Sequence, residues 1–272
     1  MQNLVIFDFS GTLSIKAVLF GEDENLIREL KHSGLWQIGL NSLDMFWNDV
    51  IAPTWQQGAT TVTGYKNLLT ARISSICRSS QKDIAHCTAA FTDRYFSSSC
   101  IHPAWIPLLH DLVSQPGTLV IIATDHYAEA TDQILRQLEE SGVPGVPASQ
   151  VDVKFRGDSI IVVNSADLGC LKATPEFWQT VRVSLAPEAV SQILVIDDFG
   201  GNEALQDSYA DAEKIIIREQ STIQVLTDVF NCPVRTFRFL LHNKPSAESE
   251  TLMDEFQGIV KKAEAFIKEV MV

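Results

Sequence analysis

The chain begins with a short apolar run, Leu4-Val5-Ile6-Phe7, which ends at Asp8 and is followed by Gly11. A short apolar run bounded by a carboxylate and a glycine turn is typical of a buried β-strand. Strand-like and helix-like runs then alternate along the second half of the chain: strands at residues 118–123, 193–196 and 214–217, and helices at residues 107–114, 129–140, 175–183 and 250–270. Alternation of this kind predicts a doubly wound parallel sheet with right-handed crossovers.

Two segments depart from this alternation. Residues 151–154 and 159–163 flank Arg156-Gly157-Asp158, which predicts a hairpin with a glycine turn. Residues 15–105 hold no convincing strand, and apolar residues recur in them at the three- and four-residue spacing of helices. The helices predicted there lie at residues 22–32, 43–51, 66–77 and 82–95. We therefore expect an α/β protein, a Rossmann-like sheet domain of residues 1–14 and 106–272 with an inserted α-helical domain of residues 15–105.

Composition narrows the class of protein. The 272 residues are 46 % hydrophobic and 20 % charged, as in ordinary soluble globular proteins. A net charge of −13 argues against a broad surface for nucleic acid or anionic membrane. The first strand begins almost at Met1, which leaves no room for a signal peptide, and no apolar run approaches the length of a membrane span. Five dispersed cysteines favour reduced thiols. These features predict a cytoplasmic protein without nucleic-acid or membrane partners.

Polar side chains stand where the predicted strands end or helices begin. They are Asp8 with Thr12, Thr124-Asp125, Lys172 and Asp197-Asp198. Singly, each has a structural explanation, such as a helix cap or a solvated side chain. Two adjacent carboxylates that end a buried strand, however, repel each other and need a cation. Because the carboxyl ends of parallel strands share one edge of the sheet, we expect these residues to converge there.

The converging residue types suit phosphoryl transfer. Asp8 can act as the nucleophile. Asp198, together with Asp8 and a backbone carbonyl, offers the hard oxygen ligands that Mg²⁺ prefers. Lys172 can balance the charge between the carboxylates and a phosphate, and the Thr124 hydroxyl can donate a hydrogen bond to a phosphoryl oxygen.

These motifs resemble those of the haloacid dehalogenase (HAD) superfamily, whose members are mostly Mg²⁺-dependent phosphatases. Asp8-Phe9-Ser10-Gly11-Thr12-Leu13 is similar to the first motif, and Thr124 matches the second. Lys172 with Thr174-Pro175-Glu176-Phe177 resembles the third, and Asp197-Asp198-Phe199-Gly200-Gly201-Asn202 the acidic fourth. The resemblance spans residues 3–14 and 106–220, the predicted core in chain order.

The resemblance implies roles for individual residues. Asp8 is the expected nucleophile, and the expected magnesium ligands are Asp8, the Ser10 carbonyl and Asp198, with Asp197 as an alternative ligand. Thr124, Asp125, His126 and Lys172 are the residues expected to bind the phosphate of a small phosphorylated substrate.

Residues 15–105 fall where the family places its helical C1-type cap, which closes over the sheet edge and selects the substrate. The candidates for an apolar pocket lining are Trp36, Phe46, Trp47, Trp55 and Tyr65. An aromatic residue at helical spacing belongs to the core more often than to a pocket, so both interpretations stay open.

Ser10 departs from the family pattern. Family phosphatases carry a second Asp two residues after the nucleophile, which protonates the leaving group and then activates water. A hydroxyl is too weak an acid or base near neutral pH to replace this Asp. General acid–base catalysis is typically worth about 10²–10⁴-fold in rate. The first interpretation is a phosphatase for a good leaving group, such as an acyl phosphate or diphosphate, or one that uses another acid. His126 is the candidate acid, and a structural histidine bonded to backbone is its alternative.

Two other interpretations remain. Phosphonoacetaldehyde hydrolases resemble this family, lack the second Asp and cleave a C–P bond, but they need a Schiff-base lysine in the cap, where this chain has Lys16, Lys31, Lys66 and Lys82. A phosphate-binding or regulatory protein that keeps the metal site is the other. Dehalogenation fits less well, because the family's dehalogenases carry an aromatic residue at the Ser10 position and do not use this Mg²⁺ arrangement. The sequence thus favours a Mg²⁺-dependent phosphohydrolase that forms an aspartyl-phosphate on Asp8.

Overall fold

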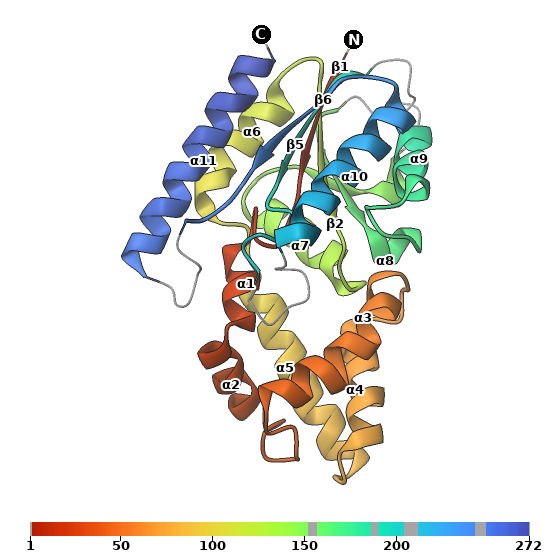
Figure 1. Ribbon diagram of the computed structural model, residues 1–272, viewed down its shortest axis with the longest axis vertical. Helices are drawn as coiled ribbons and strands as arrows, with labels where there is room; N and C mark the ends of the chain where they lie inside the picture. Colours follow the sequence, from red (N-terminus) through yellow and green to blue (C-terminus); the bar gives the residue numbers. More distant parts are fainter. Residues whose placement is uncertain (1, 152–156, 186–189, 204–211, 243–248, 272) are drawn as a thin grey trace.

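The computed structural model describes residues 2–151, 157–185, 190–203, 212–242 and 249–271. Its centre is a six-stranded sheet in the order β3-β4-β2-β1-β5-β6 (Figure 1), in which every pair of neighbouring strands is parallel. The strands are β1 (Gln2–Phe7), β2 (Thr118–Thr124), β3 (Gly145–Pro147), β4 (Ile160–Asn164), β5 (Val190–Asp197) and β6 (Val234–Arg238). This confirms the predicted Rossmann-like α/β fold.

Helices cover both faces of the sheet. Those that flank it are α6 (Ile106–Ser114), α7 (Glu129–Glu140), α8 (Ser165–Leu168), α9 (Pro175–Ser184), α10 (Ala212–Phe230) and α11 (Glu250–Val270), with short 3-10 turns η2 (Pro103–Trp105) and η3 (Ala148–Gln150). Val5 and Phe7 pack with α6, α7 and α11, whereas Leu4 and Ile6 pack with α9 and α10. Successive strand residues point to opposite faces, so the apolar run of β1 is buried on both sides.

The remaining helices form one group at the carboxyl end of the strands (Figure 1). They are α1 (Ile15–Gly21), α2 (Asp23–His32), the π-helix η1 (Met45–Ile51), α3 (Ala52–Ala59), α4 (Tyr65–Ile76) and α5 (Gln81–Ser98), called here the helical layer. Its apolar side chains form a core of their own, in which Phe20, Leu30 and Phe91 pack together with Tyr127 from the loop after β2. The helical layer therefore lies over the sheet edge where Asp8 is placed.

Most of the predicted elements are confirmed. The helices predicted at residues 129–140 and 250–270 agree with α7 and α11, and the helices predicted at residues 66–77 and 82–95 correspond to α4 and α5. The prediction for residues 214–217 is wrong, because these residues lie in α10. Ile216 and Ile217 are 46 % and 59 % exposed there. A run of β-branched residues favours a strand locally, but packing of the whole segment decides its state.

The last strand of the sheet is β6, which the sequence pattern did not reveal. Its residues pair with β5 from Val234 to Arg238. The segment Val-Arg-Thr-Phe-Arg lies at the sheet edge and alternates only weakly between apolar and polar positions. The predicted hairpin is wrong for its second strand, since β4 pairs in parallel with β2 and β3. Most of its first strand and the start of its turn, residues 152–156, lie outside the described residues.

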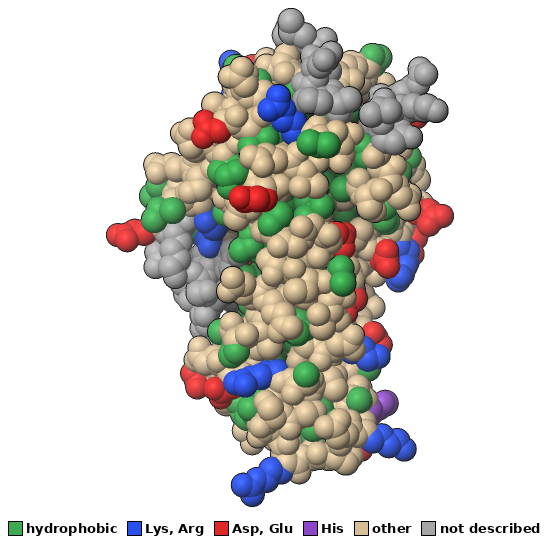
Figure 2. Space-filling view, turned by 90° about the vertical axis from the view of Figure 1, so that its right-hand side faces the viewer, with side chains coloured by type: hydrophobic (Ala, Val, Ile, Leu, Met, Phe, Trp, Pro, Cys, Tyr) green, Lys and Arg blue, Asp and Glu red, His purple; other side chains and the backbone are tan. Residues whose placement is uncertain are grey.

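On the face drawn in Figure 2, basic and acidic side chains are interspersed and do not gather into one charged patch. Within the part of the chain that the structure describes, no helix is both long enough and apolar enough to cross a membrane.

Candidate active site

The loop after β1 presents Asp8 at the carboxyl edge of the sheet. Its turn is closed by two backbone hydrogen bonds, from the Ser14 N–H to the Phe9 carbonyl at 2.8 Å and from the Gly11 N–H to the Ser14 carbonyl at 3.0 Å. Gly11 has a φ of +77°, and a Cβ there would overlap the carboxylate of Asp198. Glycine is therefore required at this position both by the backbone and by the neighbouring loop.

The loops after β1 and β5 are tied together by buried side chains. The Thr12 hydroxyl accepts a hydrogen bond from the Asp198 N–H at 3.0 Å, and the Trp105 indole donates to the Thr12 carbonyl at 2.9 Å. The Asn202 amide donates to the carbonyls of Gly11 and Phe239, both at 2.8 Å. These contacts hold the two acidic segments in a fixed relation, although the residues they join are 186 and 191 positions apart in the sequence.

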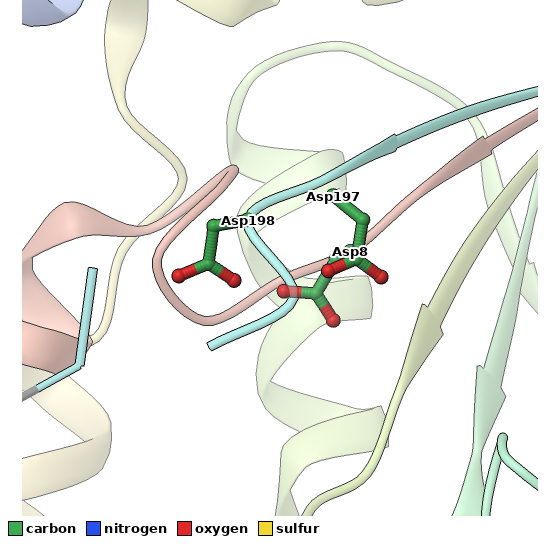
Figure 3. A group of neighbouring side chains, drawn as sticks. All are labelled: Asp8, Asp197 and Asp198. Atoms are coloured by element: carbon green, nitrogen blue, oxygen red, sulfur yellow. The ribbon is translucent and has the colours of Figure 1, made fainter. Parts of the chain in front are cut away.

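Three carboxylates meet at this edge, from Asp8, Asp197 and Asp198 (Figure 3). Each offers an oxygen atom within 4.8 Å of the others, and the residues are only 7 %, 7 % and 2 % exposed. Lys172 forms an ion pair with Asp8, and its Nζ lies 3.3 Å from Asp197 Oδ2. Asp198 instead accepts hydrogen bonds from the N–H groups of Gly200 at 3.0 Å and Asn202 at 2.9 Å. Lys172 thus pairs with two of these three buried acids.

The electrostatics of this cluster favour a bound cation. Burial, with the charges of Glu203 and Asp197, raises the pKa of Asp198 to about 8 against the opposing backbone donors. Burial and the two neighbouring aspartates also raise the pKa of Asp8 well above its ordinary value, although Lys172 opposes this. Like charges in a dry site disfavour ionisation, and a divalent cation between them reverses that effect. An all-oxygen donor set suits a hard cation such as Mg²⁺.

Lys172 is held in place by its main chain. Its N–H donates to Asp125 Oδ1 at 2.9 Å, and its carbonyl accepts from the Trp178 indole at 2.7 Å. Burial acts to lower the pKa of the Lys172 amine, but the carboxylates around it outweigh burial and raise that pKa well above the ordinary value. The lysine is therefore charged, and the Asp125 side chain positions its loop.

Thr124 and His126 lie on either side of Asp125, at the end of β2. Both are buried, and both line the cavity described below. His126 Nδ1 accepts from the Tyr127 N–H at 2.8 Å, so its ring proton is assigned to Nε2, which lies 2.9 Å from the Tyr95 hydroxyl. Burial lowers the pKa of His126 to about 4. A neutral imidazole with both nitrogens engaged fits the structural alternative for His126 and not the proton donor.

Two further site residues were missed in the sequence, Glu203 and Arg218. The Ser10 hydroxyl donates to Glu203 Oε1 at 3.2 Å, and Arg218 Nε donates to the Phe199 carbonyl at 3.0 Å. Glu203 directly follows the fourth acidic motif, which is the signal that would have found it. Arg218 follows residues expected to form a strand, so no sequence signal pointed to it.

A cavity of about 330 Å³ lies between the sheet edge and the helical layer. Asp8, Ser10, Asp125, Lys172, Asp197, Asp198 and Glu203 line its sheet side. Of the aromatic candidates, Phe46, Trp47, Trp55 and Tyr65 line it from the helical layer. Trp36 packs against the core of the helical layer instead and lies under the Lys31 amine, 5.0 Å from the ring centre. The predicted site residues thus line one cavity.

No protein-family model and no curated protein matches the sequence. Two solved structures resemble the fold. A 2-haloacid dehalogenase from Pseudomonas syringae pv. tomato DC3000 is 13% identical with a TM-score of 0.48, and the match covers 80% of this chain and 100% of that one. The magnesium-bound HAD hydrolase YfnB from Bacillus subtilis is 15% identical with a TM-score of 0.43, over 95% of this chain and 98% of that one. These are similarities of fold, and no residue's role follows from them.

Proposed function

We propose that the protein is a hydrolase of the HAD superfamily, and specifically a Mg²⁺-dependent phosphohydrolase acting on a small phosphorylated substrate. The observation that carries the proposal is the convergence of Asp8, Lys172 and Asp198 beneath one cavity. A carboxylate nucleophile, a paired cation and an acidic metal cluster are what phosphoryl transfer through an aspartyl-phosphate needs.

In this proposal Asp8 attacks phosphorus in line with the leaving oxygen, and the P–O bond to the leaving group breaks as that oxygen takes up a proton. Water then attacks the aspartyl-phosphate, which releases phosphate and restores the Asp8 carboxylate. Lys172 and Thr124 hold the phosphoryl oxygens from the cavity wall. Asp8, Asp198 and the Ser10 carbonyl, with Asp197 as alternative ligand, would hold Mg²⁺, which would supply the positive charge that lets a phosphate approach these carboxylates.

The proton transfers need a group other than Ser10. Glu203 is the carboxylate whose oxygen accepts the Ser10 hydrogen bond at 3.2 Å, and it lines the cavity. We assign the proton-transfer role to Glu203, because a carboxylic acid can both donate to a leaving oxygen and accept from water. The pKa of His126, lowered to about 4 by burial, speaks against the histidine as donor.

Cleavage of a C–P bond through a Schiff base is less well supported. That chemistry needs an amine in the cavity from the helical layer. Among the described residues that line the cavity, none is Lys16, Lys31, Lys66 or Lys82. The remaining competitor is a phosphate-binding or regulatory protein with the same site.

A substrate panel separates these proposals. Phosphate esters, acyl phosphates, diphosphates, phosphonates and 2-haloacids are each assayed with Mg²⁺ and with EDTA. Mg²⁺-dependent phosphate release, together with a hydroxylamine-sensitive phosphorylated protein, supports the phosphohydrolase. Ligand binding without release of phosphate from any compound supports a binding protein, and halide release supports a dehalogenase.

The nucleophile is tested by Asp8→Asn, which keeps the side-chain shape and removes the attacking oxygen anion. Phosphate release is expected to fall by on the order of 10⁴-fold or more, with the circular dichroism spectrum unchanged. Asp111→Asn removes a carboxylate from an exposed position on α6 and serves as the matched control. Retention of Mg²⁺-dependent turnover by Asp8→Asn would remove Asp8 from the mechanism.

A further inference from the structure

The helical side of the cavity differs in chemistry from the sheet side. Every described residue of the helical layer that lines the cavity is uncharged, and most are apolar or aromatic. Among the described lining residues, the polar groups on this side are the Asn48 amide, the hydroxyls of Tyr65 and Tyr95, and the indole N–H groups of Trp47 and Trp55. The Asn48 amide donates to Asp44 at 2.7 Å, and the Tyr95 hydroxyl lies 2.9 Å from His126. A ligand group that points toward the helical layer therefore meets mainly hydrocarbon and ring faces.

The aromatic wall is rigidly placed. Tyr65 stacks on Tyr127 with ring centres 3.9 Å apart, and Trp55 meets the same ring edge-on at 5.5 Å. Gly58 lies so close to Tyr127 that a Cβ would overlap the ring. The Tyr65 N–H also donates to Glu129 of α7 at 2.8 Å, which fastens α4 to the sheet domain. The aromatic wall is thus preorganised for binding.

In the described part of the chain, the positive charge that lines the cavity lies on its sheet side. Among the described residues that line the cavity, the basic ones are Lys172 and Arg218. Lys172 is already engaged by Asp8 and Asp197, and Arg218 Nε is bonded to the Phe199 carbonyl. With a metal bound, the positive charge on the sheet side can balance one phosphoryl group. A second phosphate or a carboxylate directed toward the helical layer would be buried there without a cation, which is unfavourable.

The size of the cavity limits the ligand further. Its volume of about 330 Å³ lies at the lower end for small-molecule pockets, which range over roughly 300–1,000 Å³. This leaves room for a phosphoryl group with a compact organic body.

We propose, on the basis of the phosphohydrolase function above, that the leaving group is a compact, uncharged and apolar alcohol, aromatic or branched-aliphatic. Burying its hydrocarbon surface against Trp55 and its neighbours is favourable. The hydroxyls of a sugar or polyol phosphate would lose their hydrogen bonds to water in the same place, and the wall offers too few hydrogen-bonding groups to replace them. Substrate selection then comes from the helical wall, and reaction chemistry from the sheet edge.

The test compares kcat/KM for phenethyl and isoamyl phosphate with that for glycerol phosphate and a hexose phosphate, all at saturating Mg²⁺. All four leaving groups are alkoxides, so the comparison reports chiefly on recognition. We expect at least a tenfold preference for the apolar esters. Equal or faster hydrolysis of the polyol and hexose esters would overturn the inference while leaving the phosphohydrolase function intact.

Substitutions of two tryptophans test whether the preference comes from the aromatic wall. Trp55→Ala is expected to raise KM for phenethyl phosphate about tenfold and to leave KM for glycerol phosphate unchanged. Trp36→Ala is the matched control. Trp36 packs against the same helical core but is not one of the described residues that line the cavity. Trp55→Gln keeps more of the side-chain volume and is used if the alanine variant does not fold; it should lower the same preference. An equal response to the Trp36 and Trp55 changes would overturn the assignment.

Binding separates this inference from the proposed function. Phenethyl phosphonate and glycerol phosphonate, which lack the hydrolysable ester bond, are titrated by calorimetry with Mg²⁺. Tighter binding of phenethyl phosphonate without phosphate release from any ester would refute the phosphohydrolase and support the apolar cavity. Tighter binding of glycerol phosphonate would overturn the apolar cavity whether or not turnover is seen.

Discussion

The two walls of the cavity are built on different principles. On the sheet side, polar and charged residues converge from strand ends, and each is positioned by a specific hydrogen bond, as Asn202 and Thr12 position the Asp8 and Asp198 loops. On the helical side, rings are positioned by packing against one another, as Tyr65 is by Tyr127. Removal of one partner on the sheet side leaves a buried charge or dipole unpaired. Removal of one ring mainly leaves space. We therefore expect substitutions on the sheet side to be more damaging.

The largest effect is expected from Lys172→Met, which leaves Asp8 and Asp197 buried without their cation. The free energy of unfolding in EDTA should fall by about 3–5 kcal/mol, as for other broken buried ion pairs. Mg²⁺ should restore part of the loss, because it supplies charge to the same carboxylates. Urea denaturation with EDTA and with Mg²⁺ measures both effects. Lys261→Met, at an exposed position on α11, is the control and should change neither. Equal stability of Lys172→Met and wild type in EDTA would contradict the comparison.

A smaller effect, confined to catalysis, is expected from Glu203→Gln. The amide can keep a hydrogen bond with Ser10 but cannot transfer a proton as a carboxyl group does. Steady-state assays should show a loss of about 10²–10⁴-fold in kcat, with little change in KM. Ser10→Asp combined with Glu203→Gln should recover part of the rate, since it returns one carboxylate to the same place. A rate that is insensitive to Glu203→Gln would assign proton transfer to another group.

His126 lies where the two walls of the cavity meet, and we expect it to make the stability of the protein depend on pH. Burial lowers the pKa of His126 from 6.5 to about 4, so the unfolded chain takes up this proton at a higher pH than the folded protein does. The contribution of His126 to the free energy of unfolding, on the order of 3 kcal/mol, is fully present above pH 6.5 and is lost as the pH falls toward 4. Denaturation of wild type and His126→Phe between pH 7 and 4 measures it. The variant should show the shallower slope, and parallel slopes would exclude this role.

Two glycines provide the smallest and most directly matched comparison. Gly11→Ala forces a residue into left-handed backbone against Asp198 and should cost about 2 kcal/mol or more, together with most of the activity. Gly258→Ala, in α11 with nothing within 4 Å of the added carbon, should stabilise the protein by about 0.5–1 kcal/mol. Thermal and urea unfolding of the two variants measure the difference in sign. Destabilisation by both would mean that Gly258 does not lie on an open face of helix α11.

Much of the site could be predicted because its residues occupy strand ends. Asp8, Thr124 and Asp197 each follow an apolar run, and parallel topology then places them at one edge. Glu203 and Arg218 could not be predicted in this way, since they reach the cavity through a loop and from a helix. The sequence predicts His126 as a candidate, but its neutral state depends on burial, which a local pattern does not record.

The sequence by itself determined the alternating strands and helices, the helical segments of residues 15–105 and the acidic residues that end β1 and β5, because periodicity and strand-end position are local properties. Only the tertiary structure decided that residues 214–217 are helical, that β6 completes the sheet and that Trp55 lines the cavity while Trp36 does not. It also decided that Ser10 faces Glu203. These outcomes depend on contacts between distant segments, and no local pattern records which side chains will meet.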